Sequence, residues 1–187
     1  MYPLFAKRVV LRTPAETIDY YRRLGFYSRE STGEILTRYR AEWGKEPPAG
    51  KPWDDVFLLR YDEAAVWTGD PEADVCSGND VYASTLAEWA KITNGAFAPT
   101  DIRETWHSDA GPIEISFLQD GRRQTIQPSY QDDWIDLEIL AELNRITQAS
   151  GKRFNCAVDG NFCLVVFLSP ETERRLRRER GFPFALS

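Results

Sequence analysis

The chain has 187 residues, of which 42% are hydrophobic and 28% charged, a composition ordinary for a folded globular domain. Six tryptophans, eight tyrosines and ten phenylalanines supply enough large side chains for a core, which argues against global disorder. The net charge of −6 argues against a general nucleic-acid binder, and no apolar run approaches the ~20 residues that cross a bilayer. The amino-terminal residues lack the apolar stretch of a signal peptide. We therefore expect a cytoplasmic protein that binds neither nucleic acid nor membrane.

The amino-terminal part predicts a strand and two helices. Residues 5–12 are typical of a short strand. Each helix that follows is opened by a capping box, formed by Thr13 with Glu16 and by Ser31 with Glu34. A glycine after the last apolar residue of each helix is expected to end it.

Residues 45–53 contain three prolines and one glycine, so they predict a loop and are the best candidate for a linker. We interpret residues 1–187 as one domain. Within it, a helical part at 1–44 and a main body at 54–187 are possible sub-structures on either side of this loop.

The middle of the chain predicts a hairpin and a helix. The apolar runs 56–61 and 64–68 are expected to pair as a β-hairpin. A loop at 69–79 leads to a helix at 80–93, because apolar residues recur there at helical spacing. Asn79 or Asp80 is expected to cap this helix.

The second half of the chain predicts two more hairpins. A strand at 101–106 precedes a hairpin at 113–127, whose Asp120-Gly121 pair is typical of a type I′ turn. A further hairpin is expected at 153–168, with its turn at Asp159-Gly160.

Two helices are expected around the last hairpin. One is predicted to start at the N-cap Asp133 and to run to about Thr147. The other starts after Ser169 and ends before Gly181. Its five arginines and three acids favour an exposed, salt-bridged surface, because Glu171 and Glu173 each stand four residues before an arginine.

Hairpins mixed with helices, without a series of β-α-β units, favour an α+β fold with antiparallel sheet and about five helices packed on it. The expected core comprises Val81, Leu86, Trp89, Ile92, Ile113, Ile115, Phe117, Ile139, Leu143, Val165 and Phe167.

The cysteines and the single histidine favour no metal centre. Cys76, Cys156 and Cys163 are odd in number and widely spaced, which excludes a disulfide framework. Cys156 and Cys163 flank a predicted turn and could form a bridge there, although two small buried side chains are favoured. His107 alone cannot build a typical zinc site, so we expect no cofactor; a magnesium or calcium site made of carboxylates stays open.

The strongest functional signal is an acidic stretch. Residues 54–80 hold eight acidic residues and one arginine, whereas residues 1–40 carry a net charge of +4. Acidic side chains steer association with a basic partner, and tryptophans are common anchors in interfaces. We expect Asp70, Glu72 and Asp74 to be the most exposed of these acids; a solvated loop that only keeps the protein soluble is the alternative. The candidate binding residues are Trp53, Asp54, Asp55, Asp62, Glu63, Trp67, Asp70, Glu72 and Asp74.

Two other patterns suggest catalysis less strongly. The acidic residues at 132–138 are consistent with acid–base chemistry, although helix capping explains them as well. A Cys76–His107 pair would resemble a nucleophile and its base, but no local motif supports it.

The general character resembles that of small, acidic, tryptophan-rich bacterial cytoplasmic proteins, a group that includes many immunity proteins of toxin systems. No motif carries individual residues across from that group. We therefore keep a non-enzymatic module that binds a basic protein, in one form an immunity-type inhibitor of a basic toxin, as the main interpretation. A small hydrolase that uses the carboxylates near 132–138 or Cys76 with His107 is the alternative, and a structural subunit of an assembly is a third. The oligomeric state stays open.

Overall fold

The computed structural model describes residues 12–185. Within them the fold is α+β, with six α-helices and two antiparallel sheets of three strands each. The expected strand at residues 5–12 lies outside the described residues except for Arg12. The helices are α1 (Pro14–Arg22), α2 (Thr32–Trp43), α3 (Pro52–Leu59), α4 (Val81–Lys91), α5 (Ile139–Ile146) and α6 (Pro170–Arg175). The strands are β1 (Val66–Gly69), β2 (Thr100–Trp106), β3 (Ile113–Gln119), β4 (Arg122–Ile126), β5 (Arg153–Asp159) and β6 (Phe162–Leu168).

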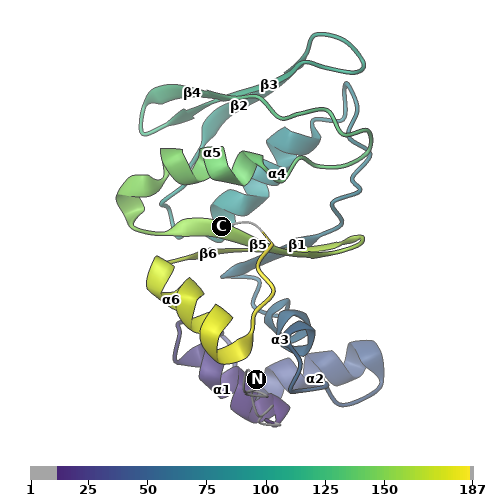
Figure 1. Cartoon of the computed structure of the whole chain (residues 1–187), viewed down its shortest axis with the longest axis vertical. Helices are drawn as coiled ribbons and strands as arrows, with labels where there is room; N and C mark the ends of the chain where they lie inside the picture. Colours follow the sequence, from purple (N-terminus) through teal and green to yellow (C-terminus); the bar gives the residue numbers. More distant parts are fainter. Residues whose placement is uncertain (1–11, 186–187) are drawn as a thin grey trace, which may run out of the picture.

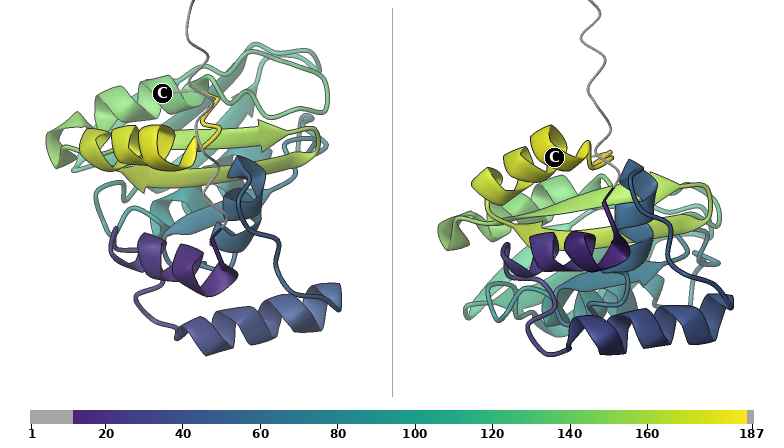
Figure 2. Two further views of the ribbon diagram at one scale, coloured as in Figure 1. Left: turned by 60° about the horizontal axis from the view of Figure 1, so that its bottom comes forward. Right: turned by 90° about the horizontal axis from the view of Figure 1, so that it is seen from below.

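The elements stack in layers (Figure 1). A central sheet has the strand order β1-β6-β5, and an outer sheet has the order β2-β3-β4. Helices α4 and α5 lie between the two sheets, and α1, α2, α3 and α6 lie on the other side of the central sheet. Figure 2 shows α2 along the outside of the molecule.

Strand β6 is the middle strand of the central sheet and is buried on both faces. Leu164, Val166 and Leu168 pack against the helices α1 to α3, whereas Val165 and Phe167 pack toward α4 and α5. This explains why the strand is a continuous apolar run rather than an alternating one. The central sheet thereby separates two buried clusters, and the first of them joins residues 18–66 to residues 157–184.

The predicted capping boxes are confirmed. The Thr13 side chain accepts from the backbone N–H of Glu16, and the Ser31 side chain accepts from that of Glu34; each glutamate in turn accepts from the backbone N–H of its cap residue. Helix α2 ends at Gly44, whose φ of 64° is in the left-handed region that favours glycine.

The predicted hairpin at 56–68 is wrong. Residues 52–59 form helix α3, in which Pro52 takes the first turn and Asp54 accepts from the Lys51 backbone N–H at 2.8 Å. Only the second run, as β1, is a strand, and it pairs with β6 instead. A short apolar run fits a buried strand or a buried helix equally well, so the pattern at 56–61 did not distinguish them.

Two predicted boundaries also differ from the structure. Asp133 is not an N-cap, since its carbonyl accepts from Ala73 in an extended pairing and α5 begins only at Ile139. The last turn is shifted by one residue, because the β5–β6 loop is Gly160-Asn161. Asp80 occupies the N-cap position of α4 but makes no hydrogen bond from its side chain to the helix.

The remaining elements follow the prediction closely. The strand at 101–106 and the hairpin at 113–127 are present, and Asp120 and Gly121 both have positive φ. Every expected core residue is buried except Val81, which is half-buried. Cys163 is a free thiol opposite Val158, and Cys156 is buried opposite Val165, so the two do not bridge.

Candidate functional site

The fold brings together two acidic segments that lie far apart in the sequence. The backbone N–H of Ala73 donates to the carbonyl of Asp133 at 2.8 Å, and the N–H of Ile135 donates to that of Pro71 at 2.8 Å. Glu72 and Trp134 thereby pair as an isolated antiparallel bridge. We call the exposed acids of these two segments, Asp70, Glu72, Asp74, Asp132 and Asp133, the acidic strip.

The acidic strip carries no countercharge of its own. Within residues 12–185, none of its five carboxylates forms an ion pair with a lysine or arginine. Its neutral partners are two asparagines. The amide of Asn161, in the β5–β6 loop, donates to Glu72 at 2.5 Å and to Asp70 at 3.5 Å, and the amide of Asn79 donates to the Asp74 carboxylate at 3.0 Å. The charges of Asp74 and Asp133 both raise the pKa of the Cys76 thiol, so the two acids lie in the neighbourhood of the same side chain. The strip is therefore a concentrated, uncompensated negative surface.

Exposed aromatic side chains adjoin the strip. Trp134 is 36% exposed and Tyr130 is 38% exposed, and they are two of the three large hydrophobic residues exposed in the described chain. Tyr130 packs edge-on against Trp106, whose indole N–H donates to Glu104 at 2.9 Å. Aromatic side chains that are held in place cost little conformational entropy when they bind a partner.

The predicted anchors Trp53 and Trp67 are both half-buried. Trp53 packs beside Phe57 on α3, within the cluster on the far face of the central sheet. Trp67 stands edge-on to Trp89 with ring centroids 5.7 Å apart and covers Gly69. Trp134 is the aromatic residue at the strip, and sequence reasoning missed it as an anchor. The signal for it was an acid-rich segment that also contains a tryptophan.

The predicted binding acids divide into two groups. Asp70, Glu72 and Asp74 are exposed, as expected, and belong to the strip. The prediction of Asp55 and Asp62 as binding residues is wrong, because these two acids are only 1% and 5% exposed.

The other acids of that stretch have structural contacts. Asp55 pairs with Arg180, and Asp62 accepts from the Tyr27 backbone N–H at 2.5 Å. Burial raises the pKa of Asp62, although backbone hydrogen bonds oppose the effect. Asp54 caps α3, and Glu63 is exposed with Arg38 at 3.5 Å.

The geometry does not favour the catalytic alternatives. Partial burial raises the pKa of Cys76, and Asp74 and Asp133 raise it further, whereas a nucleophilic cysteine needs a lowered pKa. His107 is exposed in the turn before β3. Asp136 accepts from the backbone N–H groups of Ser129 at 2.8 Å and Glu138 at 3.0 Å, so both of its oxygens are engaged.

A surface hollow of about 710 Å³ lies beside α5. Leu140, Phe154 and Arg153 line it together with Asp136 and Glu138, whereas Asp132 and Asp133 do not. Two of the four acids at 132–138 therefore line this hollow, and both carboxylate oxygens of one of them, Asp136, already accept from backbone N–H groups.

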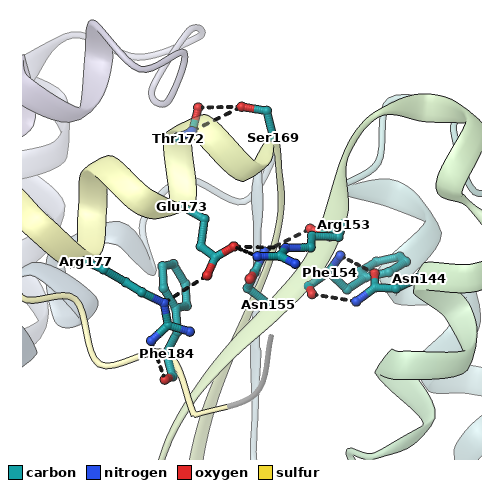
Figure 3. Close-up of polar contacts among 9 residues, drawn as sticks. All are labelled: Asn144, Arg153, Phe154, Asn155, Ser169, Thr172, Glu173, Arg177 and Phe184. Carbon is teal, nitrogen blue, oxygen red and sulfur yellow. Dashed lines mark hydrogen bonds and ion pairs between the residues drawn. The ribbon is translucent and has the colours of Figure 1, made fainter.

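The arginine at the edge of the hollow belongs to a structural ion-pair network (Figure 3). Arg153 and Arg177 both contact the carboxylate of Glu173, which is 3% exposed, and Arg177 also donates to the Phe184 carbonyl at 3.0 Å. The helix that was expected to be exposed is exposed only in part, because Glu173 is buried. On its exposed side, Arg175 pairs with Glu179. The network joins α6 to β5, and it leaves Arg153 with a charged partner of its own.

Among residues 12–185, no cluster of three or more histidine, cysteine, aspartate or glutamate side chains is placed to hold a metal ion. None of the helices described there is long and apolar enough to cross a membrane. No protein-family model, curated protein or solved structure matches the chain.

Proposed function

We propose that this chain is a non-enzymatic module that binds a basic protein partner through the acidic strip and Trp134. The observation that supports it is the pairing of residues 71–73 with 133–135. This pairing gathers five exposed carboxylates, none of which forms an ion pair among residues 12–185, from two segments beside an exposed indole. An immunity-type inhibitor of a basic toxin, from a bacterium, is the specific form of this proposal.

The physical chemistry of such a surface favours fast and salt-sensitive binding. Carboxylates that have no cationic partner nearby attract cationic side chains over a Debye length, ~8 Å at physiological ionic strength. They act mainly on the association rate, whereas a desolvated aromatic anchor acts mainly on the dissociation rate. The acids and the indole therefore have separable roles.

The experiment compares two charge-reversal variants with the same net charge. The strip variant carries Asp70→Lys, Glu72→Lys and Asp74→Lys. The control variant carries Glu88→Lys, Asp109→Lys and Glu171→Lys, three acids that are exposed outside the strip. Partners captured by the native chain from lysate are identified, and the association rate of each is measured at low and moderate salt.

The proposal expects a basic partner whose association slows by about ten-fold or more with the strip variant, within the range that electrostatic steering provides. The control variant should keep most of the native rate. Trp134→Ala should weaken binding by about 2 kcal/mol or more, chiefly through faster dissociation. Equal slowing by both triple variants would mean that only net charge matters, and unchanged rates would mean that the acids serve solubility alone.

A further inference from the structure

The turn after α4 has a feature that the proposed function does not use. Helix α4 ends at Lys91, and Asn94 and Gly95 follow as exposed turn residues. Asn94 has a φ of 53° and Gly95 a φ of 86°, in the left-handed region that these two residue types tolerate best. Asn94 is the only one of the five asparagines in the chain that is followed by glycine.

Two polar groups of this turn have no hydrogen-bond partner among the described residues. Among residues 12–185, neither the Asn94 carboxamide nor the Gly95 backbone N–H takes part in a hydrogen bond. A Cβ built on Gly95 would have no neighbouring heavy atom within 4 Å, so the space beside the Gly95 Cα is open. A bond from the Ala96 N–H to the Thr93 carbonyl, at 3.3 Å, spans the turn.

Three other asparagines have an engaged amide, a buried side chain or a bulky residue after them. The Asn144 amide is engaged on both sides by the backbone of Phe154, and Asn155 is fully buried. The Asn161 amide donates to Glu72, and a phenylalanine follows it.

We propose that Asn94-Gly95 is a site of spontaneous deamidation through a succinimide. Hydroxide removes the proton of the Gly95 amide, and this nitrogen attacks the side-chain Cγ of Asn94. A bond forms between the Gly95 nitrogen and Cγ, the bond from Cγ to the side-chain nitrogen breaks, and ammonia leaves with a proton from water. Water then opens the ring at either carbonyl, which gives aspartate or isoaspartate. The reaction needs only solvent water and hydroxide.

The product alters the molecule in two ways. Each event adds one negative charge to a chain that already carries −6. Isoaspartate also lengthens the backbone by one carbon between Thr93 and Phe97. Thr93 and Phe97 are held together, because the Thr93 hydroxyl accepts from the Phe97 N–H at 3.1 Å. The one proton of this hydroxyl has the carbonyls of Ala90, at 2.8 Å, and Phe97, at 3.0 Å, as acceptors. We expect the isoaspartyl form to unfold at a lower temperature than the parent.

The test incubates the native full-length chain at mildly alkaline pH and follows the tryptic peptide 92–103, in which Asn94 is the one asparagine. The mass of this peptide should rise by the exchange of NH₂ for OH, and isoaspartyl methyltransferase should label it. Gly95→Ala should slow the change strongly because a Cβ hinders the attacking nitrogen, and Asn94→Gln should slow it because a six-membered ring closes less readily.

The deciding comparison is between the deamidation rates of different asparagines, measured in the folded and in the denatured chain. Faster reaction at Asn94 than at Asn144 or Asn161 in the folded chain supports the proposal. A folded chain in which Asn94 reacts no faster than these two would overturn it, even if Asn94 reacts after denaturation, since the turn would then protect the site. Equal rates for the parent and Gly95→Ala would overturn the mechanism.

Discussion

The ion pair between Asp55 and Arg180 offers the sharpest test of how the layers are held together. It joins α3 to the short π-helical turn, residues 176–180, that follows α6, and the two side chains are 1% and 6% exposed. Tyr21 donates to the same carboxylate at 2.7 Å, and Arg180 also donates to Thr17 at 3.1 Å. Three segments distant in sequence thus meet at one buried carboxylate.

The perturbation is Arg180→Met, which keeps much of the side-chain volume and removes the charge. The Asp55 carboxylate then stays buried with the Tyr21 hydroxyl as its remaining side-chain donor. Removal of one partner from a buried pair costs ~3–5 kcal/mol, because the other charge is left without compensation. For a chain of this size, such a loss lowers the melting temperature by about 6–20 °C.

The assay is urea unfolding followed by tryptophan fluorescence, with thermal unfolding alongside. Arg178→Met is the matched control, since Arg178 lies in the same turn, is 69% exposed and, among residues 12–185, pairs only with Glu179. An exposed pair of that kind contributes ~0–1 kcal/mol. The double variant Asp55→Asn with Arg180→Met should be more stable than the sum of the single changes predicts, because neither charge is then left alone.

The reasoning would be refuted if Arg180→Met cost no more free energy of unfolding than Arg178→Met. That result would mean that solvent reaches the Asp55 carboxylate freely after the arginine is removed. Additive costs in the double-mutant cycle would likewise show that the two groups do not interact.

Two further predictions concern titratable groups. Burial alone would raise the pKa of Glu173, but hydrogen bonds from Arg177 and Arg153 outweigh it and lower the pKa below its usual 4.5. The ionised Glu173 therefore stabilises the fold fully above pH 4.5, and this stabilisation is lost as the pH falls through the lower pKa of the folded state. In a plot of the urea midpoint against pH, Glu173→Gln should reduce the fall of the midpoint at acid pH. An unchanged fall would contradict this. Cys163 is buried, and burial raises the pKa of its thiol, whereas Cys76 is half-exposed. A maleimide should therefore label Cys76 first in the native chain. Early labelling of Cys163 would show that the hairpin opens.

Local signals in the sequence determined much of the secondary structure. The capping boxes at Thr13 and Ser31 and the Asp120-Gly121 turn depend on contacts within a few residues, so they hold whatever surrounds them. The helical stripe of α4 and the alternation in β3 also predicted which side chains are buried. The α+β class followed from the order of these elements.

Tertiary structure decided the features that local signals leave ambiguous. Residues 56–59 of the run at 56–61 became part of helix α3, which packs against the face of the sheet where β6 pairs with β1. Residues 133–135 became extended because residues 71–73 pair with them. The pairing of residues 71–73 with 133–135 also brings the two segments of the acidic strip together. Composition located the acids at 54–80 but could not separate Asp55, buried against Arg180, from Asp70, left exposed. The physical reason is that burial and charge compensation depend on partners more than fifty residues away, as Arg180 is from Asp55 and Asp133 from Ala73.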